Sequence, residues 1–379
     1  MTSPSRLSLF ARGVRVLDLS AFLPGPLASL LLADMGAEIL KVEPPVGDAM
    51  TQLGPRDAEG HPLFYEALNA GKSVRRMDLK QREAREAFLR LVAKSDVLIE
   101  GFRPGVMNRL GLGYPVLRET NPGLIYCSLS GYGATSPMAP RAGHDANYLA
   151  AAGVLHRNGT DAPVFYDPPL SDVTGSLFGV IAILGALRAR EADGQGCAID
   201  IGLADVVMPL QLFQVAAYGA IGTVPRRRET YLNGGAAYYQ VYATADGRHV
   251  ALGAAEPKFW RAFCEAARRP DWIGREAEPL PQAALIADVA ALVGALTLAE
   301  CEARFADPNC CVSPVLDLGE AVASPHHRAR GLVRHAPDGA LQALFPALVD
   351  GVPPAHRPTL CHAHEKEAGA PCRTSPKPG

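Results

Sequence analysis

The stretch "GVRVLDLSAFLPGPLASLLLADMGAEILKVEPP", residues 13–45, decides the fold class. Residues 14–20 have the apolar and β-branched composition of a buried strand, and "AEILKVE" predicts a second strand. Pro24 and Pro26 stand where the intervening helix would begin, and Gly36 stands where it would end. A strand, a helix and another strand in this order predict a β-α-β unit with parallel strands.

The same alternation continues beyond this unit. Buried strands are expected at 95–102 and 123–133, and "QREAREAFLRLVAKS" has helical spacing. The segment 172–190 predicts a long apolar helix, and "GQGCAIDIGLADVVM" predicts another strand followed by a helix. Strands that alternate with helices indicate the α/β class, with a parallel sheet that carries helices on its faces.

The second part of the chain has a different character. A Pro-, Gly- and Arg-rich segment at 218–236 is followed by a β-hairpin that turns at Asp246–Gly247. Two helical segments come next, "EPKFWRAFCEAARR" and "LIADVAALVGALTLAECEARFA", and "CVSPVLDLGEAVASPHHRARG" predicts a strand that returns toward the first domain. The expected division is a large domain at 1–200, a linker at 201–229, a small domain at 230–308, and a return to the large domain with a C-terminal tail at 309–379.

Length and composition restrict the class of protein. The 379 residues exceed the usual size of a single core, which supports two domains. The net charge of −2 provides no overall field for nucleic acid or membrane surfaces, so we expect neither as a partner. The eight cysteines include no CxxC pair, which favours reduced thiols and a cytoplasmic location. We read no secretory signal and no membrane span.

Two segments carry cations that could hold an anionic ligand. "NAGKSVRRMDLK" places Lys72 and Arg75 around a glycine turn, and "EGFRPGVMNRLGLGY" adds Arg103 directly after a predicted strand. Cations at the carboxyl ends of parallel strands can bind a phosphorylated ligand, although solvated surface cations explain the same pattern. The sequence contains neither GxGxxG nor GxxxxGK[ST], so a dinucleotide site or a P-loop lacks its motif.

Three residues could carry acid-base chemistry, and each also has a structural explanation. Asp172 or its neighbour Ser171 could simply cap the helix at 172–190, although the N–H groups of a helix start could also stabilise an oxyanion there. His144 could be a turn residue beside Asp145, which is the expected cap of "ANYLAAAG". Glu256 could simply begin a helix.

Histidine-rich segments do not predict a metal site. "PHHRARG" at 325–331 is surrounded by cations, and "CHAHE" at 361–365 lies in a tail without clear patterning. Neither has a second pair of ligands at a useful spacing. We therefore expect no metal.

Several motifs, in this order, resemble the family III CoA-transferases of the CaiB/BaiF type. Besides the stretch quoted first, they are "NAGKSVRRMDLK", "EGFRPGVMNRLGLGY", "GHDANYLAAAG", "SDVTGSLFGVIAILGAL" and "ADGRHVALGAAEPKFW". The resemblance runs from about residue 12 to 332. It implies an α/β fold with a Rossmann-like large domain, built from both chain ends, and a smaller α+β domain. It also implies an interlocked homodimer with sites between the large domain of one subunit and the small domain of the other.

Within this family the chain is most similar to the α-methylacyl-CoA racemases. Racemases have a "GHD" histidine, here His144, and the aspartate that both branches share is Asp172, 28 residues later (172 − 144 = 28). A glutamate of the small domain orients the histidine in racemases, and Glu256 stands at that place. The chain departs from the pattern at Pro168, where racemases commonly have an asparagine that supports the aspartate.

The resemblance implies racemisation or epimerisation at the α-carbon of a 2-methylacyl-CoA thioester, by proton transfer on two faces through an enolate. His144, Asp172 and Glu256 would be the catalytic residues. No prosthetic group is implied, because coenzyme A is part of the substrate. The residues expected to contact it are Lys72, Arg75, Gly101, Phe102, Arg103, Asp145 and Tyr148.

Two alternatives stay open from the sequence. A CoA-transferase would use Asp172 as a nucleophile through an aspartyl intermediate, with Gly234–Gly235 in a covering loop. A CoA-binding protein without catalytic activity would explain the departure at Pro168.

Overall fold

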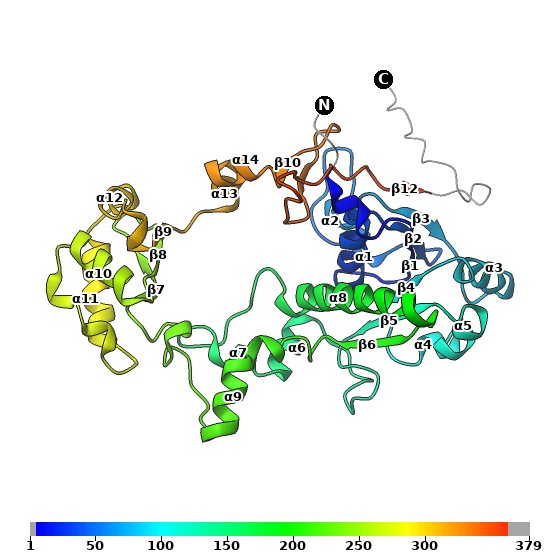
Figure 1. Cartoon of the computed structure of the whole chain (residues 1–379), viewed down its shortest axis with the longest axis horizontal. Helices are drawn as coiled ribbons and strands as arrows, with labels where there is room; N and C mark the ends of the chain where they lie inside the picture. The colour runs from blue at the N-terminus through cyan, green and yellow to red at the C-terminus, as the bar shows by residue number, and fades with distance from the viewer. Residues whose placement is uncertain (1–4, 363–379) are drawn as a thin grey trace. The chain divides into compact units, whose positions relative to one another are not determined.

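The computed structural model describes residues 5–362, and the chain divides into two compact units (Figure 1). Unit 1 comprises Met1–Ala152, Tyr166–Leu210 and Ser324–Gly379. Unit 2 comprises Gly153–Phe165 and Gln211–Ala323. Unit 1 therefore combines segments from the early and late parts of the described chain, and each unit has its own core.

The boundaries of unit 2 differ from those of the predicted small domain, 230–308. Residues 153–165 belong to unit 2 because the guanidinium of Arg227 donates hydrogen bonds to the carbonyl oxygens of His156 and Thr160, at 2.9 and 3.0 Å. At the other end unit 2 extends to residue 323. These contacts join segments that are about 70 residues apart, and local patterning cannot reveal them.

Unit 1 is built on a seven-stranded sheet in the order β12-β3-β2-β1-β4-β5-β6, with every pair parallel. The strands are β1 (Arg15–Asp18), β2 (Glu38–Glu43), β3 (Ser73–Arg76), β4 (Val97–Glu100), β5 (Ile125–Ser130), β6 (Ala198–Gly202) and β12 (Cys361–His362). The predicted α/β class with a parallel sheet is confirmed. The strand order reverses between β1 and β4, and open α/β sheets bind ligands at the carboxyl ends of the strands at such a reversal.

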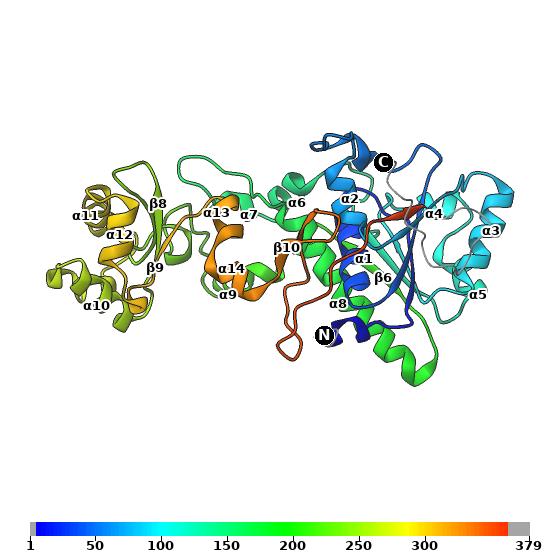
Figure 2. The ribbon, with the colours of Figure 1, turned by 90° about the horizontal axis from the view of Figure 1, so that it is seen from above.

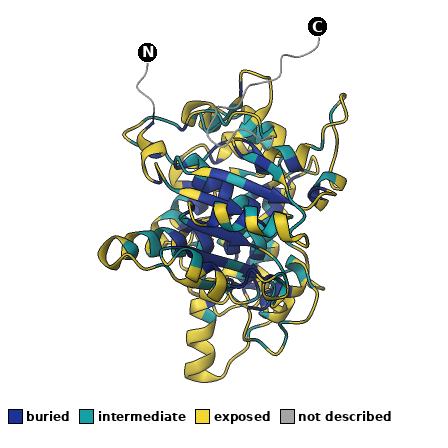
Figure 3. Ribbon diagram, turned by 90° about the vertical axis from the view of Figure 1, so that its right-hand side faces the viewer, coloured by how far each residue is buried: buried dark blue, intermediate teal, exposed yellow. Residues whose placement is uncertain are grey.

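Helices cover both faces of this sheet (Figure 2). On one face α1 (Pro24–Asp34) and α8 (Leu170–Asp193) pack against residues such as Val97 and Ile99. On the other face Leu98 meets α3 (Arg82–Val92), α4 (Val106–Arg109) and α5 (Tyr114–Thr120). The sheet is buried between these layers (Figure 3), which explains why its strands read as continuous apolar runs.

One described helix, α8, is long and apolar enough to cross a membrane by length and composition. It packs against α1, β5 and β6 in unit 1. This packing explains much of its apolar composition, because a core helix of a globular protein satisfies the same criterion.

Unit 1 contains further short elements. They are η1 (Arg6–Leu9), η2 (Ala49–Gln52), α2 (Leu63–Asn69), α6 (Asp145–Ala151), α14 (Pro325–Arg330), β10 (Val333–His335) and β11 (Leu341–Ala343), while η3 (Pro209–Gln211) lies at the boundary with unit 2. The tail therefore has more structure than its sequence predicts. Arg357 pairs in a bidentate manner with Asp34 at the end of α1, with both N–O distances 2.7 Å, and this fixes the segment before β12.

Unit 2 is an antiparallel sheet with helices. The sheet consists of β7 (Tyr239–Ala243), β8 (His249–Gly253) and β9 (Val312–Pro314). The helices are α7 (Val154–Arg157), α9 (Leu212–Ile221), η4 (Tyr231–Asn233), α10 (Pro257–Ala266), η5 (Pro270–Trp272), η6 (Arg275–Ala277), α11 (Ala283–Gly294), α12 (Leu298–Arg304), η7 (Pro308–Cys310) and α13 (Leu318–Ala323). The predicted hairpin is confirmed, and Gly247 has the positive φ of 75° that its turn requires.

Two segments of this region differ in detail from the expectation. The segment "CVSPVLDLGEAVASPHHRARG" supplies β9, which pairs with β8 in unit 2, and the chain returns to unit 1 only after that strand, from Ser324 onward. The helical segment "LIADVAALVGALTLAECEARFA" forms two helices, α11 and α12, bent by 107°. Thr297 accounts for the break, because it caps α12 reciprocally with Glu300.

Replacing Gly36 with alanine is expected to lower the free energy of unfolding by about 1–3 kcal/mol. Gly36 ends α1 with φ of 99°, and an added Cβ would lie 2.0 Å from the carbonyl oxygen of Ser8. Gly13→Ala is the matched control, because Gly13 also has a positive φ but faces open space. Urea unfolding of both variants measures the difference, and equal losses of stability would contradict the proposed contact.

Candidate active site

The starts of α6 and α8 meet through one side chain. His144 is the N-cap of α6, and its backbone N–H donates a hydrogen bond to the side-chain oxygen of Asn147 at 3.0 Å. The carboxylate of Asp145, the next residue, accepts hydrogen bonds from the N–H groups of Ser171 and Asp172, at 2.6 and 3.2 Å. Asp145 therefore caps α8 from another helix. This corrects the expectation that Asp145 caps its own helix, where His144 takes that place.

Asp172 is the third residue of α8, not its cap. The helix begins at Leu170 and Pro169 is the N-cap, so neither Asp172 nor Ser171 has the capping role expected from sequence. Burial, and then the negative charge of Asp145, raise the pKa of Asp172 to about 7. An acid with this pKa can both accept and donate a proton near neutral pH.

Asp145→Asn is expected to lower the pKa of Asp172, because it removes a neighbouring negative charge while an amide oxygen can still accept the bonds from α8. Carboxyl ¹³C NMR titration of the labelled protein measures this pKa directly, without a substrate. An unchanged titration of Asp172 would show that burial alone raises its pKa.

Tyr148, a predicted coenzyme A contact, lies in the interior. It is 7% exposed, its hydroxyl donates to the carbonyl of Gly143, and its ring packs perpendicular to Tyr132 with centroids 5.3 Å apart. An added Cβ on Gly143 would lie 2.9 Å from this ring, which explains the glycine before His144. We therefore revise Tyr148 from a ligand contact to a residue that supports the loop of His144.

The loop after β4 lies at the carboxyl edge of the sheet and contains Gly101, Phe102 and Arg103. The buried carboxylate of Glu100 accepts a hydrogen bond from the N–H of Phe102 at 2.7 Å. Its other oxygen accepts one from the Tyr126 hydroxyl at 3.0 Å. The loop therefore has a fixed start beside the strand reversal, where a ligand of an open α/β sheet is expected.

Two of the three predicted phosphate-binding cations remain available to a ligand. In residues 5–362 the side chains of Arg75 and Arg103 have no recorded ion pair or hydrogen bond, and the Nε of Arg75 is buried. A guanidinium without a protein partner can bind a phosphate in a bidentate manner. The positions of Arg75 and Arg103 therefore fit the predicted role.

Lys72 differs from that expectation. It is 1% exposed, and its ammonium donates to Pro26 O at 2.8 Å, Asn69 Oδ1 at 3.1 Å and Asp18 Oδ2 at 3.4 Å. Three acceptors use all three N–H donors of a lysine, so none remains for a ligand. The sequence predicted that Lys72 contacts the ligand, and its partner Asp18, 54 residues earlier, could not be recognised from spacing.

Lys72 belongs to a buried charged cluster that the sequence analysis did not single out. Lys41 bonds to Asp48 at 2.9 Å, and all the charged members are less than 5% exposed. Although burial raises the pKa of Asp18, the charges of Lys41 and Lys72 lower it to about 2. A signal existed in the sequence, because a charged residue within each of two apolar strands, "VLDLS" and "EILKVE", is unusual unless paired.

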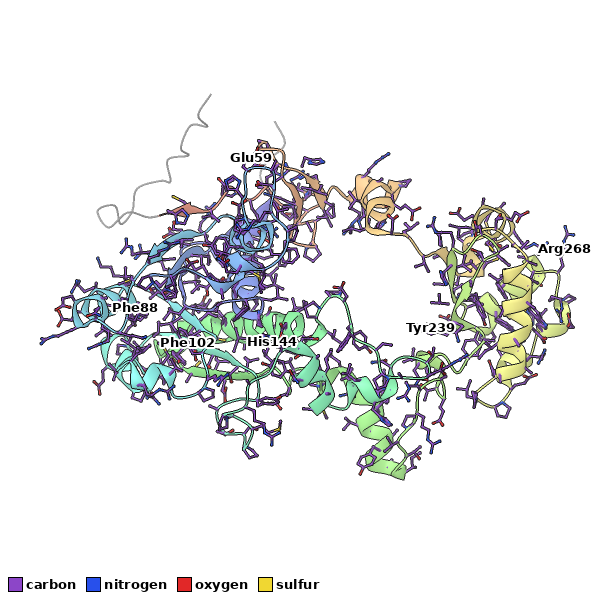
Figure 4. The ribbon with its side chains drawn as sticks, turned by 180° about the vertical axis from the view of Figure 1, so that it is seen from behind. Glu59, Phe88, Phe102, His144, Tyr239 and Arg268 are labelled. Carbon is purple, nitrogen blue, oxygen red and sulfur yellow. The ribbon has the colours of Figure 1, made fainter. Side chains whose placement is uncertain are left out.

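Glu256 lies in unit 2 as the N-cap of α10, and its carboxylate is exposed. His144 and Phe102 are in unit 1 (Figure 4). The structure therefore brings His144, Asp145 and Asp172 together in one unit and places Glu256 in the other.

Among the described residues, one exposed group could offer three metal ligands. Asp57, Glu59 and His61 have ligand atoms within 4.8 Å of one another. His61 Nδ1 lies 2.8 Å from Asp57 Oδ2, and this pair explains the grouping. The group lies outside the two histidine-rich segments considered from sequence, "PHHRARG" and "CHAHE"; residues 363–365 of the latter lie outside the described residues.

Comparison with known proteins decides the family. The profile of CoA-transferase family III matches residues 12–363. The chain belongs to this family. A solved structure of a CaiB/BaiF family protein from Brucella suis has a TM-score of 0.81 at 29% identity, covering 92% of this chain and 95% of that one. The predicted family is confirmed, and with it the α/β fold.

Relatives within CoA-transferase family III carry two kinds of name. The alpha subunit of succinyl-CoA–L-malate CoA-transferase from Chloroflexus aurantiacus is 37% identical, over 84% of this chain and 77% of that protein. The α-methylacyl-CoA racemase of Homo sapiens is 34% identical, over 84% of this chain and 81% of that protein. Overall identity does not separate the two reactions, so the choice between them depends on the site.

Proposed function

We propose that this member of CoA-transferase family III racemises the α-carbon of 2-methylacyl-CoA thioesters. One observation carries the proposal. His144 directly precedes Asp145, whose carboxylate accepts a hydrogen bond from the N–H of Asp172. An imidazole and a carboxyl group therefore occupy neighbouring helix starts. Racemisation needs two such groups, one on each face of the α-carbon. The pKa of Asp172, about 7, suits proton transfer in both directions.

In the proposed reaction one group removes the α-hydrogen as a proton, and the electrons of the C–H bond delocalise into the thioester to give an enolate. The other group returns a proton to the opposite face, which inverts the configuration. From one enantiomer His144 is the base and Asp172 the acid, and from the other their roles exchange. Each turnover leaves both residues with exchanged protonation states, which solvent then restores.

The donors for the enolate oxygen differ from those first expected. The N–H groups of Ser171 and Asp172 donate to Asp145, so they are not available to an oxyanion. Within residues 5–362 no acceptor is recorded for the N–H groups of Asp145 and Ala146, in the first turn of α6. We assign the enolate oxygen to these donors, because a helix start stabilises developing negative charge.

We assign the coenzyme A part of the substrate to the carboxyl edge of the sheet in unit 1. Arg75 and Arg103, both without protein partners among the described residues, would bind its phosphates. Gly101 and Phe102 would provide the loop that leads from β4 to Arg103. No prosthetic group takes part in the proposed steps, and the cytoplasmic location remains a prediction.

Unit 2 contains a cavity whose lining has no charged side chain. The cavity has a volume of about 430 Å³ and lies on the β7–β8–β9 sheet. Its lining residues are Leu232, Gly234, Tyr239, Gln240, Val241, Ala251, Leu252, Gly253, Cys311 and Ser313. Glu256 follows Gly253 of this lining by three residues, and burial and then the charge of Glu256 raise the pKa of Cys311.

We also propose that the protein is a homodimer in which Glu256 of unit 2 orients His144 of a second copy. The support is α9, which has no buried residue (Figure 3) although Leu212, Phe213 and Tyr218 are each more than half exposed. A helix with this much exposed apolar surface is typical of an interface. Light scattering after gel filtration is expected to give about twice the chain mass of 40.1 kDa, and the chain mass itself would contradict the proposal.

CoA transfer is the second candidate, and the relative at 37% identity favours it. Asp172 would then attack the acyl-CoA as a nucleophile. The same experiment separates the two reactions: each enantiomer of 2-methylbutanoyl-CoA is incubated in D₂O, with and without L-malate or succinate. Deuterium at the α-carbon together with loss of optical purity supports racemisation. A new CoA ester of the added acid, without deuterium at the α-carbon, would overturn it in favour of transfer.

A further inference from the structure

We propose that Phe22 is a positioning residue for His144, held in place by the buried Lys41–Asp18–Lys72 cluster. This inference rests on the proposed function of His144. The ring of Phe22 lies perpendicular to the imidazole, at an interplanar angle of 83° with centroids 6.0 Å apart. Perpendicular packing of this kind is attractive and orients both rings.

The backbone at Phe22 has an unusual conformation. Its φ is 62°, in the left-handed region where a bulky residue is rare and disfavoured. The side chain gains little from burial, since it is 42% exposed. A strained backbone that presents a half-exposed aromatic ring to a candidate catalytic histidine indicates a role in the site.

The loop that carries Phe22 is fixed at both ends by buried lysines. The ammonium of Lys41 donates to the carbonyl of Ser20 at 2.7 Å, and that of Lys72 donates to the carbonyl of Pro26 at 2.8 Å. Asp18 lies within 3.4 Å of Lys72 and accepts a hydrogen bond from the N–H of Ser20 at 2.9 Å. Phe22 therefore lies in the chain between two carbonyl groups, those of Ser20 and Pro26, that accept hydrogen bonds from buried lysines.

The loop is also tied to the helix of Asp172. The hydroxyl of Ser176 on α8 lies 2.7 Å from the carbonyl oxygen of Pro24 and 2.9 Å from that of Asp172. Gly25 packs so closely on Ser20 that an added Cβ would lie 2.1 Å from its hydroxyl. The same loop therefore contacts His144 through Phe22 and the first turn of α8 through Ser176. These two contacts hold both candidate proton-transfer groups, His144 and Asp172, in position relative to one another.

Two variants of Phe22 distinguish the effect of losing the aromatic ring from the effect of relieving the strained backbone. Phe22→Gly removes the ring and accommodates the positive φ, so its thermal stability should equal or exceed that of the original protein. Phe22→Tyr restores the ring. Phe10→Ala is the control, because Phe10 is a 60%-exposed phenylalanine of the same unit and lies at the C-cap of η1.

We expect Phe22→Gly to lower kcat for racemisation by about 10- to 100-fold with KM changed by less than about threefold, since misorientation of a catalytic group affects the chemical step. Phe22→Tyr should recover most of this loss, and Phe10→Ala should match the original protein. In ¹H NMR spectra the ring-proton shifts of His144 should move in Phe22→Gly, because the ring current of Phe22 is lost.

Unchanged kcat in Phe22→Gly, or unchanged His144 ring-proton shifts, would overturn the inference. The NMR measurement needs no substrate, so it decides the contact even if the protein proves to be a transferase. Conversely, racemisation that persists in the His144 and Asp172 variants would contradict the proposed function, and the shifts would still report on Phe22.

Discussion

Asp172→Asn is expected to reduce racemisation by about 10²–10⁴-fold, the usual contribution of a positioned acid or base. Asparagine keeps the shape of the side chain and removes its ability to take or give a proton. In the proposed mechanism His144 still acts on one side of the α-carbon, so slow hydrogen exchange should survive for one enantiomer only. His144→Gln should show the opposite preference, with exchange retained for the other enantiomer.

Mass spectrometry of each pure enantiomer incubated in D₂O measures these rates. Asp167→Asn is the matched control, because Asp167 is an exposed aspartate five positions before Asp172. The same residual enantiomer in both catalytic variants would contradict a two-face mechanism. Normal racemisation in both variants would remove Asp172 and His144 from the reaction.

The same substitution changes the pH dependence of stability. Because the pKa of Asp172 is raised to about 7 from an ordinary value of 3.8, the folded protein binds more protons than the unfolded chain between these values. The contribution of Asp172 to the free energy of unfolding therefore falls as pH rises through this window. Asp172→Asn should flatten that decline, and chemical denaturation at pH 4.5 and pH 7.5 measures it.

Lys41→Met is expected to lower the free energy of unfolding by about 3–5 kcal/mol, the effect of removing one partner from a buried ion pair. Lys41 and Asp48 have side chains that are 0% and 2% exposed, with 2.9 Å between Nζ and Oδ2. Without the ammonium, the carboxylate of Asp48 and the carbonyl of Ser20 lose a buried partner. Asp18 also loses part of the positive charge that keeps it ionised.

Guanidinium unfolding at neutral pH measures the loss. Lys80→Met provides the control, because Lys80 is exposed and such substitutions usually change stability by less than about 0.5 kcal/mol. Equal stability of Lys41→Met and the original protein would show that the cluster can be replaced by apolar packing without loss. That result would also weaken the argument that the charged cluster holds the Phe22 loop in place.

The sheet of unit 1 could be predicted where its strands are long and apolar. The opening stretch gives β1, α1 and β2 nearly as found, because hydrophobic periodicity, two prolines and Gly36 act locally. β3 was missed since "SVRR" carries two arginines, and β12 is only two residues long. β12 is the edge strand and β3 lies next to it, and in both of them pairing with a neighbour outweighs the preference of the segment itself.

The candidate site, like the sheet, could be predicted from the sequence only in part. His144 and Asp172 could be proposed from motifs, but the function of Asp145 could not, because its hydrogen bonds reach a helix 26 and 27 residues later. Lys72 was misjudged for the same reason, since its partners Pro26 and Asp18 are brought to it only by the sheet. Phe22 gave no signal, as a positive φ at a phenylalanine has no signature in the sequence.

The position of Asp145 also bears on inhibition by free carboxylic acids. Its carboxylate occupies the N–H groups with which α8 would otherwise attract an anion. A free carboxylic acid, ionised at neutral pH, would meet a negative charge at that helix start, whereas an uncharged thioester would not be repelled. The acid released when a thioester hydrolyses should therefore be a weak competitor, and the protein should keep working in its presence.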